Sequence, residues 1–380
     1  MTAPRVLILT ASYGSGHDRV ALTLADAFRG AGAVPRVVDH FRELVHPRFA
    51  AATESLYGAV LRNAPALWGL AYWVGDQISA SSPLLLGMNR IGTRKLARLL
   101  AAERPDHVVT VHPTPAAVLG ELAAGGIRVP PHTIVFTDFV THAQWVQPHV
   151  DHYCVPAEEI ARELIARGVS RERVVVTGIP VRREFGEPAD RAAARLALGL
   201  SPRHPVFLFM AGSAGTLGRL EDAARAVLLL DRAVQAVFLA GRDDRLAARL
   251  RQIVAGHESR LKVVGYVDDV RLYMAAADFV TTKAGGITLA EALAAEAPII
   301  CFGSLPGQEV RNERFATVAG VGLLARSPAQ LPRVLGIALR DTVLVRDIRE
   351  RVRRYRRPDA AAAVVSVVLP RLRAVAERAS

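Results

Sequence analysis

Two glycine turns, each leading into a helix, lie within the stretch 283–312 and suit an anionic ligand rich in hydroxyls. Gly285 and Gly286 let the backbone approach such a ligand closely. The free N–H groups at the start of the helix that follows them favour an anion. Glu291 lies two residues from each of two leucines that share the packed face of this helix, so it projects from the opposite face. A carboxylate in that position can accept hydrogen bonds from both hydroxyls of a ribose.

A second turn and helix follow after a short apolar run. Residues 297–302 (APIICF) are apolar throughout, which predicts a parallel strand buried on both faces. The turn 303–309 (GSLPGQE) then leads into another helix, where Gln308 and Asn312 fall on one side. Each glycine turn alone is typical of an ordinary βαβα unit, so only the combination is informative.

In combination, the Gly-Gly turn, Glu291 and the Pro-Gly-Gln-Glu loop resemble the nucleotide-sugar site of the GT-B glycosyltransferases. The stretch is most similar to the monogalactosyldiacylglycerol synthase and processive diacylglycerol glucosyltransferase family, with MurG as a more distant relative. The resemblance implies that Glu291 binds the ribose of a UDP-sugar and that Gln308 and Glu309 bind hexose hydroxyls. Ala284 stands where the family often has proline, which stiffens the turn less but removes no ligand group.

A histidine at the start of the first expected helix is the candidate general base. The segment 11–17 (ASYGSGH) follows the first expected strand and ends in His17. The positive end of a helix disfavours the imidazolium form, and a neutral imidazole can abstract a hydroxyl proton. The segment resembles the same family, in which this histidine is a proposed base, although a structural helix-start histidine would fit the bare motif. Asp138 ends an expected strand and could position the histidine, act as the base itself, or cap the next turn.

The resemblance assigns further residues to the donor and the acceptor. Small residues after the first strand of the second half would contact the diphosphate, although a plain tight turn has the same composition: Gly212, Ser213, Gly215 and Thr216. The uracil would lie along Tyr266 and Val267. The remaining donor contacts are Gly285, Gly286 and Thr288. On the acceptor side the resemblance points to His142 and Trp145.

The sequence predicts neither a metal nor a cofactor beside the donor substrate. There is no Asp-x-Asp motif to hold a metal-bridged diphosphate, so helix N-termini and glycine-loop amides would offset the charge of the leaving group. The two cysteines, Cys154 and Cys301, lie in apolar runs and are expected to be reduced core thiols, which suits a reducing, cytosolic compartment.

The formal net charge of +12 comes almost entirely from arginine and draws the protein toward anionic surfaces. Genomic base composition would also favour arginine and alanine. No aromatic–basic interleaving or recognised motif predicts nucleic acid as a partner. No apolar run reaches the roughly 18–20 residues of a spanning helix, and the N-terminal run is too short for a signal-peptide core. These features predict a protein that is neither secreted nor integral.

The segment 44–100, between the second and third expected strands, is long for a βα connection. It combines aromatic and aliphatic residues with basic ones, which suits an interface between acyl chains and anionic headgroups. Its predicted membrane contacts are Trp68, Tyr72 and Trp73. Helices that simply cover the first sheet would show the same composition.

Apolar runs alternate with helical stretches along the whole chain, which implies parallel sheets. Strands are expected at 5–10, 35–39, 107–112, 133–138, 152–155, 174–177, 206–211, 236–241, 261–266, 279–283, 298–302 and 322–325. The expected fold is α/β, of the GT-B type, with two Rossmann-like parallel-sheet domains and a cleft between them. The expected boundaries are 1–181 for an acceptor-side domain, 182–340 for a donor domain, and 341–380 for helices that return to the first domain.

These features favour an inverting glycosyltransferase that moves a hexose from a UDP-sugar to a lipid hydroxyl. Diacylglycerol is the favoured acceptor, at the inner face of the cell membrane. Three alternatives stay open: an enzyme like UDP-GlcNAc 2-epimerase, a MurG-like transferase with another lipid-linked acceptor, and a non-catalytic lipid or nucleotide sensor. The sequence does not fix the hexose, the number of sugars added, or the oligomeric state.

Overall fold

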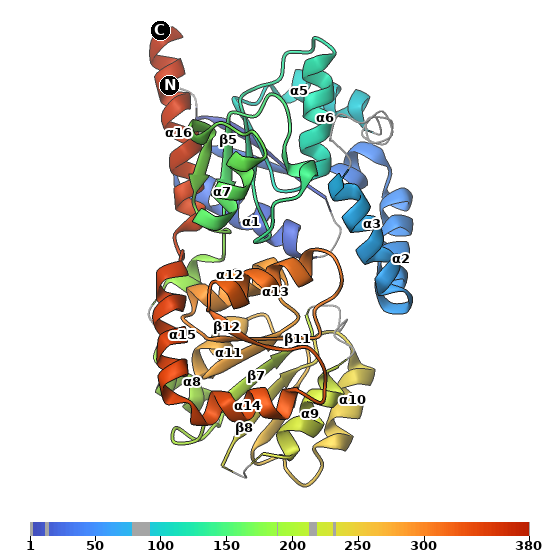
Figure 1. The fold of residues 1–380 in the computed structure, drawn as a ribbon. Helices are drawn as coiled ribbons and strands as arrows, with labels where there is room; N and C mark the ends of the chain where they lie inside the picture. The colour runs from blue at the N-terminus through green and yellow to red at the C-terminus, as the bar shows by residue number, and fades with distance from the viewer. Residues whose placement is uncertain are drawn as a thin grey trace. The chain divides into compact units, whose positions relative to one another are not determined.

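The computed structural model describes residues 3–11, 15–77, 92–187, 189–212, 219–230 and 233–379. The chain forms two units. The first contains Met1–Arg182 together with Arg357–Ser380, and the second contains Arg183–Arg356 (Figure 1). The first unit is therefore discontinuous in sequence, and its last part is contributed by the C-terminal segment.

The first unit is built on a six-stranded parallel sheet with the order β2-β1-β3-β4-β5-β6. Its strands are β1 (Arg5–Thr10), β2 (Val34–Asp39), β3 (His107–Thr110), β4 (His132–Val135), β5 (His152–Val155) and β6 (Val174–Val176). The chain runs outward from β1 to β2 and then crosses to β3 on the other side of β1. The junction of β1 and β3 is thus a topological switch point, where α/β sheets bind ligands beyond the carboxyl ends of the strands.

Helices cover this sheet and extend beyond it. They are α1 (Ser15–Gly30), η1 (His40–Val45), α2 (Pro47–Asn63), α3 (Pro65–Gln77), α5 (Thr93–Glu103), α6 (Pro113–Ala124), η2 (Ala143–Trp145), α7 (Glu158–Ala166), η3 (Arg171–Arg173) and α16 (Ala360–Ala379). Helix α16 packs against α1, although the two are far apart in sequence. A core of aliphatic side chains joins the sheet to α5 and α6.

The second unit has its own six-stranded parallel sheet, with the order β12-β11-β10-β7-β8-β9. Its strands are β7 (Val206–Met210), β8 (Gln235–Leu239), β9 (Leu261–Val264), β10 (Phe279–Thr282), β11 (Ile299–Phe302) and β12 (Gly322–Ala325). Read from β9, this is the strand order of the dinucleotide-binding Rossmann fold, and its switch point lies between β7 and β10.

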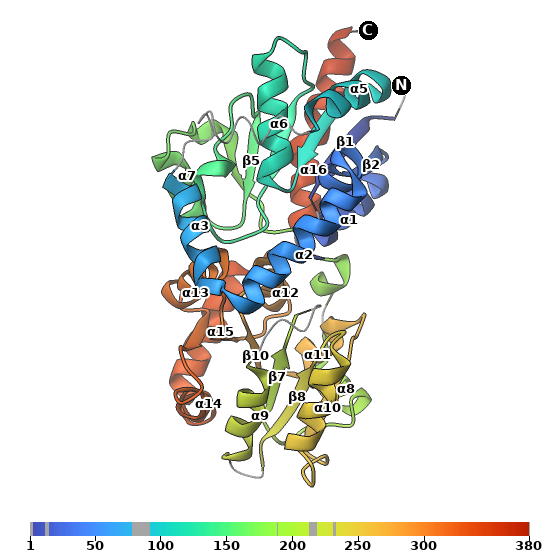
Figure 2. The ribbon, with the colours of Figure 1, turned by 90° about the vertical axis from the view of Figure 1, so that its right-hand side faces the viewer.

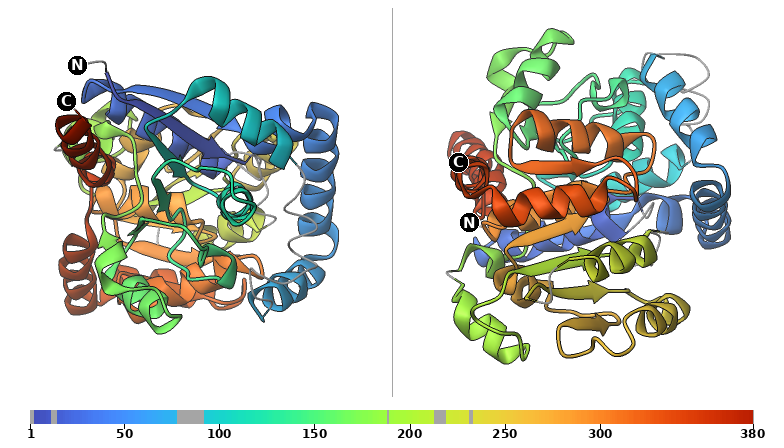
Figure 3. Two further views of the ribbon diagram at one scale, coloured as in Figure 1. Left: turned by 90° about the horizontal axis from the view of Figure 1, so that it is seen from above. Right: turned by 60° about the horizontal axis from the view of Figure 1, so that its bottom comes forward.

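Helices lie on both faces of the second sheet (Figure 3). They are η4 (Arg183–Gly186), α8 (Arg191–Ala197), α9 (Leu220–Leu228), α10 (Asp244–Ile253), α11 (Val270–Ala276), α12 (Gly286–Ala294), α13 (Gln308–Val318), α14 (Leu331–Arg340) and α15 (Thr342–Tyr355). Phenylalanines of β7, β8, β10 and β11 pack with aliphatic side chains of α9, α10 and α14 in one core.

Every strand expected from the sequence is present, because both sheets are parallel and their buried strands are apolar runs. Two details of the prediction are wrong. Strand β4 ends at Val135, so Asp138 lies in the loop after the strand instead of ending it. The return to the first unit begins at Arg357 and not at 341, because α15 packs on α12 and α14 of the second unit.

The long segment between β2 and β3 forms η1, α2, α3 and α5, and Figure 2 shows α2 and α3 as successive helices that meet at an angle. Helix α5 belongs to the core through Leu96 and Leu100, whereas α3 has no buried residue along its length. Residues 78–91 of the expected membrane segment lie outside the described residues. Among the helices that the structure describes, none combines the length and the apolar character needed to cross a bilayer.

Candidate functional site

The loops after β7 and β10 meet at the switch point of the second sheet. Gly212 follows β7 with φ of +78°, in the left-handed region that favours glycine. A Cβ atom on Gly212 would lie 3.6 Å from Cε of Lys283, which directly follows β10. The two predicted donor loops are therefore adjacent. Ser213, Gly215 and Thr216 lie outside the described residues.

Lys283 was not among the predicted site residues, yet it forms the ion pair of this region. Its Nζ lies 2.5 Å from Oε1 of Glu309, and Oε2 of Glu309 accepts a hydrogen bond of 2.9 Å from the N–H of Leu305. Both charged side chains are mostly buried. Glu309, predicted to bind hexose hydroxyls together with Gln308, is thus held by a lysine and a backbone amide. The position of Lys283 directly after a strand was the only signal in the sequence.

The glycine turn after β10 begins helix α12 as predicted, but with a strained residue before it. Gly285 is the N-cap of α12, and Thr288 is half-buried in its first turn. Ala284 is fully buried and has φ of +60°, a left-handed conformation that is costly for a residue with a Cβ atom. Proline fixes φ near −65° and could not take this conformation. Replacing proline by alanine therefore changes the backbone of the turn and not only its rigidity.

Glu291 is inside the second unit. Only 1% of its surface is exposed, and the rest of α12 from Leu289 to Ala294 is buried on all sides. A buried carboxylate is costly unless it is hydrogen-bonded. Because the side chain is buried in the structure, its role toward a ribose stays a prediction.

The remaining donor-side residues lie near the same edge of the sheet. Tyr266 follows β9 and is exposed, with the guanidinium carbon of Arg242 4.0 Å above the centre of its ring. Val267 is half-buried beside it. Gln308 begins α13 after Gly307, whose φ is +101°. The stacking arginine was missed because it follows a different strand, β8.

In the first unit, the histidine predicted as base is fixed by the neighbouring strands. Nδ1 of His17 lies 2.8 Å from the carbonyl oxygen of Val111 and 3.2 Å from Oγ1 of Thr137. A carbonyl only accepts hydrogen bonds, so in the neutral ring the proton is on Nδ1 and the lone pair is on Nε2. His17 follows β1 and Val111 follows β3, so this contact sits at the switch point of the first sheet.

A second histidine, not predicted as a site residue, lies against the first. The rings of His17 and His112 meet edge to face with centroids 4.8 Å apart. Nδ1 of His112 accepts a hydrogen bond from the N–H of Thr114 and caps α6. Burial lowers the pKa of His112 well below its usual value, and the neighbouring His17 and His40 lower it further. His112 is therefore neutral, and its position at the carboxyl end of β3 was the available sequence signal.

Asp138 is half-buried in the loop after β4, next to Thr137. We expected it to orient His17, but Nδ1 of His17 lies within hydrogen-bonding distance of Val111 and Thr137. At Nδ1 the orienting role belongs to a backbone carbonyl and a hydroxyl group. This corrects the role assigned to Asp138 at that atom.

The two residues assigned to the acceptor in the following loop are buried. Trp145 stacks on Phe136 with ring centroids 4.6 Å apart. His142 accepts a hydrogen bond at Nδ1 from the N–H of Gln144, and its Nε2 lies 3.2 Å from the carbonyl oxygen of Tyr72. His142 thus ties the loop to α3, and Trp145 packs it on Phe136. Their predicted contact with the acceptor stays a prediction.

The other three predicted membrane contacts lie on two different sides of helix α3. Trp68 packs on Tyr57 of α2 at 4.9 Å between ring centroids, and Tyr72 packs on His142 at 4.6 Å. The prediction is thus corrected for these two, which face the protein. The opposite side of the helix is exposed and apolar, and we call it the α3 apolar face: Leu67, Leu70, Trp73 and Val74.

Within the described part of the chain, no group of three or more His, Cys, Asp and Glu side chains is arranged to hold a metal ion. Cys154 and Cys301 are both free and buried. Burial raises the pKa of the Cys154 thiol to about 12 and also raises that of Cys301. Both are therefore core thiols without thiolate character.

Two family models match the chain. The model described as monogalactosyldiacylglycerol (MGDG) synthase matches residues 17–181. The model described as UDP-N-acetylglucosamine 2-epimerase matches residues 145–369, so the chain shares the domain family that this model describes.

Known proteins match over nearly the full length. The processive diacylglycerol beta-glucosyltransferase of Bacillus cytotoxicus is 31% identical over 367 residues, which cover 96% of this chain and 93% of the relative. MurG of Acinetobacter baumannii superposes with a TM-score of 0.63 at 15% identity, covering 96% of this chain and 99% of that one. The UDP-GlcNAc 2-epimerase of Neisseria meningitidis, bound to UDP-GlcNAc, has a TM-score of 0.62 at 14% identity, covering 96% and 100%.

The structural neighbours establish the GT-B fold that the sequence predicted. The full-length relative and the synthase model agree with the residues from which the resemblance was drawn. The chain belongs to the monogalactosyldiacylglycerol synthase and processive diacylglycerol glucosyltransferase family of glycosyltransferases.

Proposed function

We propose that this glycosyltransferase moves a hexose from a UDP-sugar to the free hydroxyl of 1,2-diacylglycerol, with inversion at the anomeric carbon. The names of its relatives support the lipid acceptor, and structural neighbours solved with UDP-GlcNAc or UDP support the donor. The observation that carries the mechanism is the hydrogen bond between Nδ1 of His17 and the carbonyl of Val111. It leaves Nε2 as a proton acceptor.

In this mechanism Nε2 of His17 takes the proton of the acceptor hydroxyl while the hydroxyl oxygen attacks the anomeric carbon. The bond from that carbon to the diphosphate breaks in the same displacement, and UDP leaves with the electron pair. The resulting imidazolium keeps its Nδ1 hydrogen bond to Val111. Neutral His112 adds no like charge beside it.

The leaving diphosphate gains negative charge at the switch point of the second sheet. Lys283 supplies a cation there, and the first N–H groups of α12 point in the same direction. Glu291 would accept from the ribose and Gln308 from the hexose. Glu309 would hold Lys283 in place and share the recognition of the hexose hydroxyls, with no metal required.

We propose that the protein acts in the cytoplasm at the inner face of the cell membrane and docks there through the α3 apolar face. Leu67, Leu70 and Trp73 are 63%, 57% and 60% exposed, and a helix face of this kind gains free energy when it enters an acyl-chain boundary. Each basic side chain that reaches anionic headgroups beside this face would add about 1 kcal/mol.

Docking is tested by co-sedimentation with phosphatidylglycerol vesicles. Leu67→Ser with Leu70→Ser should reduce the bound fraction, since both side chains leave water on docking. Leu196→Ser with Leu229→Ser makes the same chemical change at two exposed leucines of the second unit and should bind as wild type does. Equal sedimentation of the two double variants would defeat this placement.

The activity is tested by incubating the protein with a labelled UDP-hexose and diacylglycerol vesicles, followed by mass analysis of the lipid. Hexosyl-diacylglycerol and UDP are the expected products. UDP with free or epimerised sugar and no glycolipid would favour the epimerase alternative. The match of residues 145–369 to the UDP-N-acetylglucosamine 2-epimerase family model is the reason to test for it. Measurable binding with the UDP-sugar left intact would favour a sensor.

A further inference from the structure

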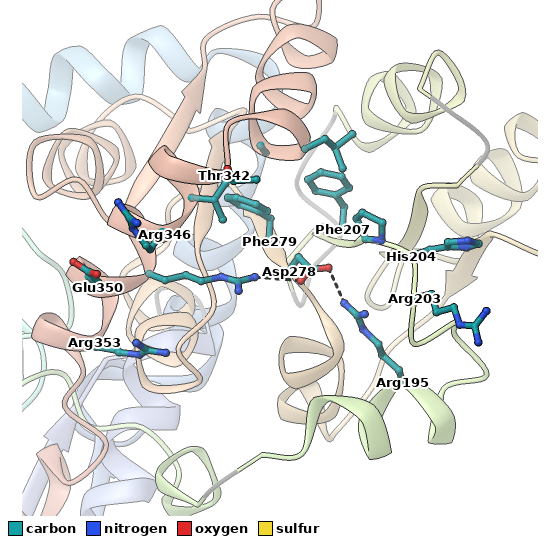
Figure 4. A pocket seen from close by; sticks show the side chains of 15 residues that line it. Arg195, Arg203, His204, Phe207, Asp278, Phe279, Thr342, Arg346, Glu350 and Arg353 are labelled. Carbon is teal, nitrogen blue, oxygen red and sulfur yellow. Dashed lines mark hydrogen bonds and ion pairs between the residues drawn. The ribbon is translucent and has the colours of Figure 1, made fainter.

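A second pocket lies in the second unit, at the edge of the sheet opposite the candidate donor site, and has a volume of about 560 Å³ (Figure 4). Its floor is formed where β7 and β10 begin, at Pro205 and Asp278, whereas Gly212 and Lys283 follow the ends of these strands. Helix α15 forms one wall. No part of the proposed mechanism uses this pocket.

Asp278 is the only acidic side chain on the floor of the pocket, and three arginines converge on it. Its oxygens lie 2.6 Å from Arg195, 3.0 Å from Arg191 and 3.2 Å from Arg349. Arg191 lies outside the lining, which holds five arginines against two carboxylates, Asp278 and Glu350, so three positive charges of the lining are left over. The positive charges also affect one another at Arg191. Burial lowers the pKa of Arg191, Asp278 opposes this effect, and Arg349 and Arg195 lower the pKa further.

The arginines differ in how well they are satisfied. Arg195 is buried and donates to the carbonyl oxygens of Ala276 and Pro202 as well as to Asp278, so it braces the fold. Arg349 reaches Asp278 through Nη2, but its buried Nε–H has no hydrogen-bond partner. A buried donor without a partner is rare and needs an explanation. Since this Nε has almost no accessible surface, a ligand would satisfy it only by drawing the guanidinium of Arg349 into the pocket.

Two more arginines of α15 project from the wall. Arg346 and Arg353 have side chains that are 68% and 65% exposed, and Figure 4 shows them with Glu350 on the helix beside Asp278. Their ion pairs, with Asp347 at 3.7 Å and Glu296 at 3.1 Å, are surface contacts of little strength. Both side chains are therefore available to turn toward an anion.

The rest of the lining is apolar. Phe207 and Phe279 form the back of the pocket, with Leu339 and Val345 at the side. Both phenylalanines are almost fully buried, so the apolar surface is shallow. It suits one ring or a short alkyl group, and it has no depth for an acyl chain.

We propose that this pocket binds a soluble phosphate monoester that carries a small apolar or aromatic group, at a site separate from the sugar nucleotide. A phosphate monoester carries about −1.5 to −2 charge at pH 7, which would offset most of the positive charge left over on the lining. Guanidinium forks bind phosphate oxygens in pairs. The volume lies within the roughly 300–1,000 Å³ of small-molecule sites.

The test is isothermal titration with phenyl phosphate in the presence of saturating UDP. Wild type should bind it, and binding should weaken about tenfold or more in Arg346→Ala with Arg353→Ala, since hydrogen bonds to charged groups are lost. Arg349→Lys keeps a charge for Asp278 but removes the unpartnered Nε–H, and it should also weaken binding. Inorganic phosphate should bind less tightly than phenyl phosphate because it lacks the apolar contact.

The matched control is Arg225→Ala with Arg249→Ala, which removes two exposed, surface-paired arginines from α9 and α10 of the same unit. It should bind as wild type does. The proposal is overturned if wild type does not bind phenyl phosphate, if UDP abolishes the binding, or if both double variants lose it equally. Because the readout is binding and not turnover, its outcome is independent of the proposed activity.

Discussion

Mild acid should destabilise the first unit, because a buried histidine must stay neutral for the unit to fold. His132 is buried in β4, where its Nε2 lies 2.9 Å from Oγ1 of Thr110 and its N–H donates to Asp151. Burial lowers its pKa from 6.5 to about 3, with a smaller contribution from His107. In the unfolded chain the same ring returns to an ordinary pKa and takes up a proton.

The sign and size follow from linkage. The folded-state pKa is depressed, so the stability is fully present above pH 6.5 and is lost as pH falls toward 3, where the folded form protonates too. The slope approaches about 1.36 kcal/mol per pH unit below pH 6.5, so His132 alone costs about 2 kcal/mol between pH 6.5 and 4.5. The pKa of His112 is also lowered in the folded protein, so this ring too makes the unit less stable as the pH falls. Net stabilities are only about 5–15 kcal/mol, so the effect is large.

Urea titrations followed by tryptophan fluorescence measure this directly, because all three tryptophans (Trp68, Trp73 and Trp145) lie in the first unit. The free energy of unfolding should fall steeply from pH 6.5 to 4.5. His132→Asn should reduce that slope by about 1.36 kcal/mol per pH unit. His149→Asn, at an exposed position, should leave it unchanged.

The test compares how steeply the free energy of unfolding changes with pH. A variant that is less stable at every pH is therefore still informative. An undiminished slope in His132→Asn would refute the argument that this buried ring titrates on unfolding. An equal reduction in His149→Asn would attribute the acid sensitivity to overall charge instead.

Three further outcomes are expected from the proposed mechanism. His17→Ala should lower turnover roughly 10²–10⁴-fold with UDP affinity unchanged, measured by glycolipid formation and calorimetry; activity within a few-fold of wild type would make Asp138 the base candidate. Glu291→Ala should weaken UDP binding by about 1.5–3 kcal/mol, and unchanged affinity would remove Glu291 from the ribose site. EDTA should leave the activity intact because the chain has no Asp-x-Asp motif; loss with EDTA and recovery with magnesium would contradict this.

The sheets and the loops that follow their strands could be predicted from the sequence, because buried parallel strands are apolar runs and glycine turns mark their ends. The edge of each sheet where ligands bind then follows from strand order. This is why His17 and Gly212 were found at switch points. Lys283 and His112 were missed because a lysine or histidine after a strand has no distinctive spacing.

Side-chain direction was the harder part. Trp68 and Trp73 of α3 are both aromatic and five residues apart, yet one packs on Tyr57 and the other is exposed. Which side of an amphipathic helix faces the protein depends on what it docks against, and the loop holding His142 is distant in sequence. The arginines around Asp278 come from α8 and α15, so their convergence is likewise a property of the tertiary structure.

The discontinuity of the first unit has a consequence for synthesis on the ribosome. Helix α16 covers α1, where Val20, Leu24 and Phe28 are completely buried. Residues 357–380 are translated after the whole of the second unit, so the second unit is complete in the nascent chain before the first can close. The usual order, in which the N-terminal domain finishes first, is thereby reversed. Until α16 is synthesised, the surface of α1 that α16 covers stays exposed on the growing chain, and a surface of this kind is a site for chaperone binding.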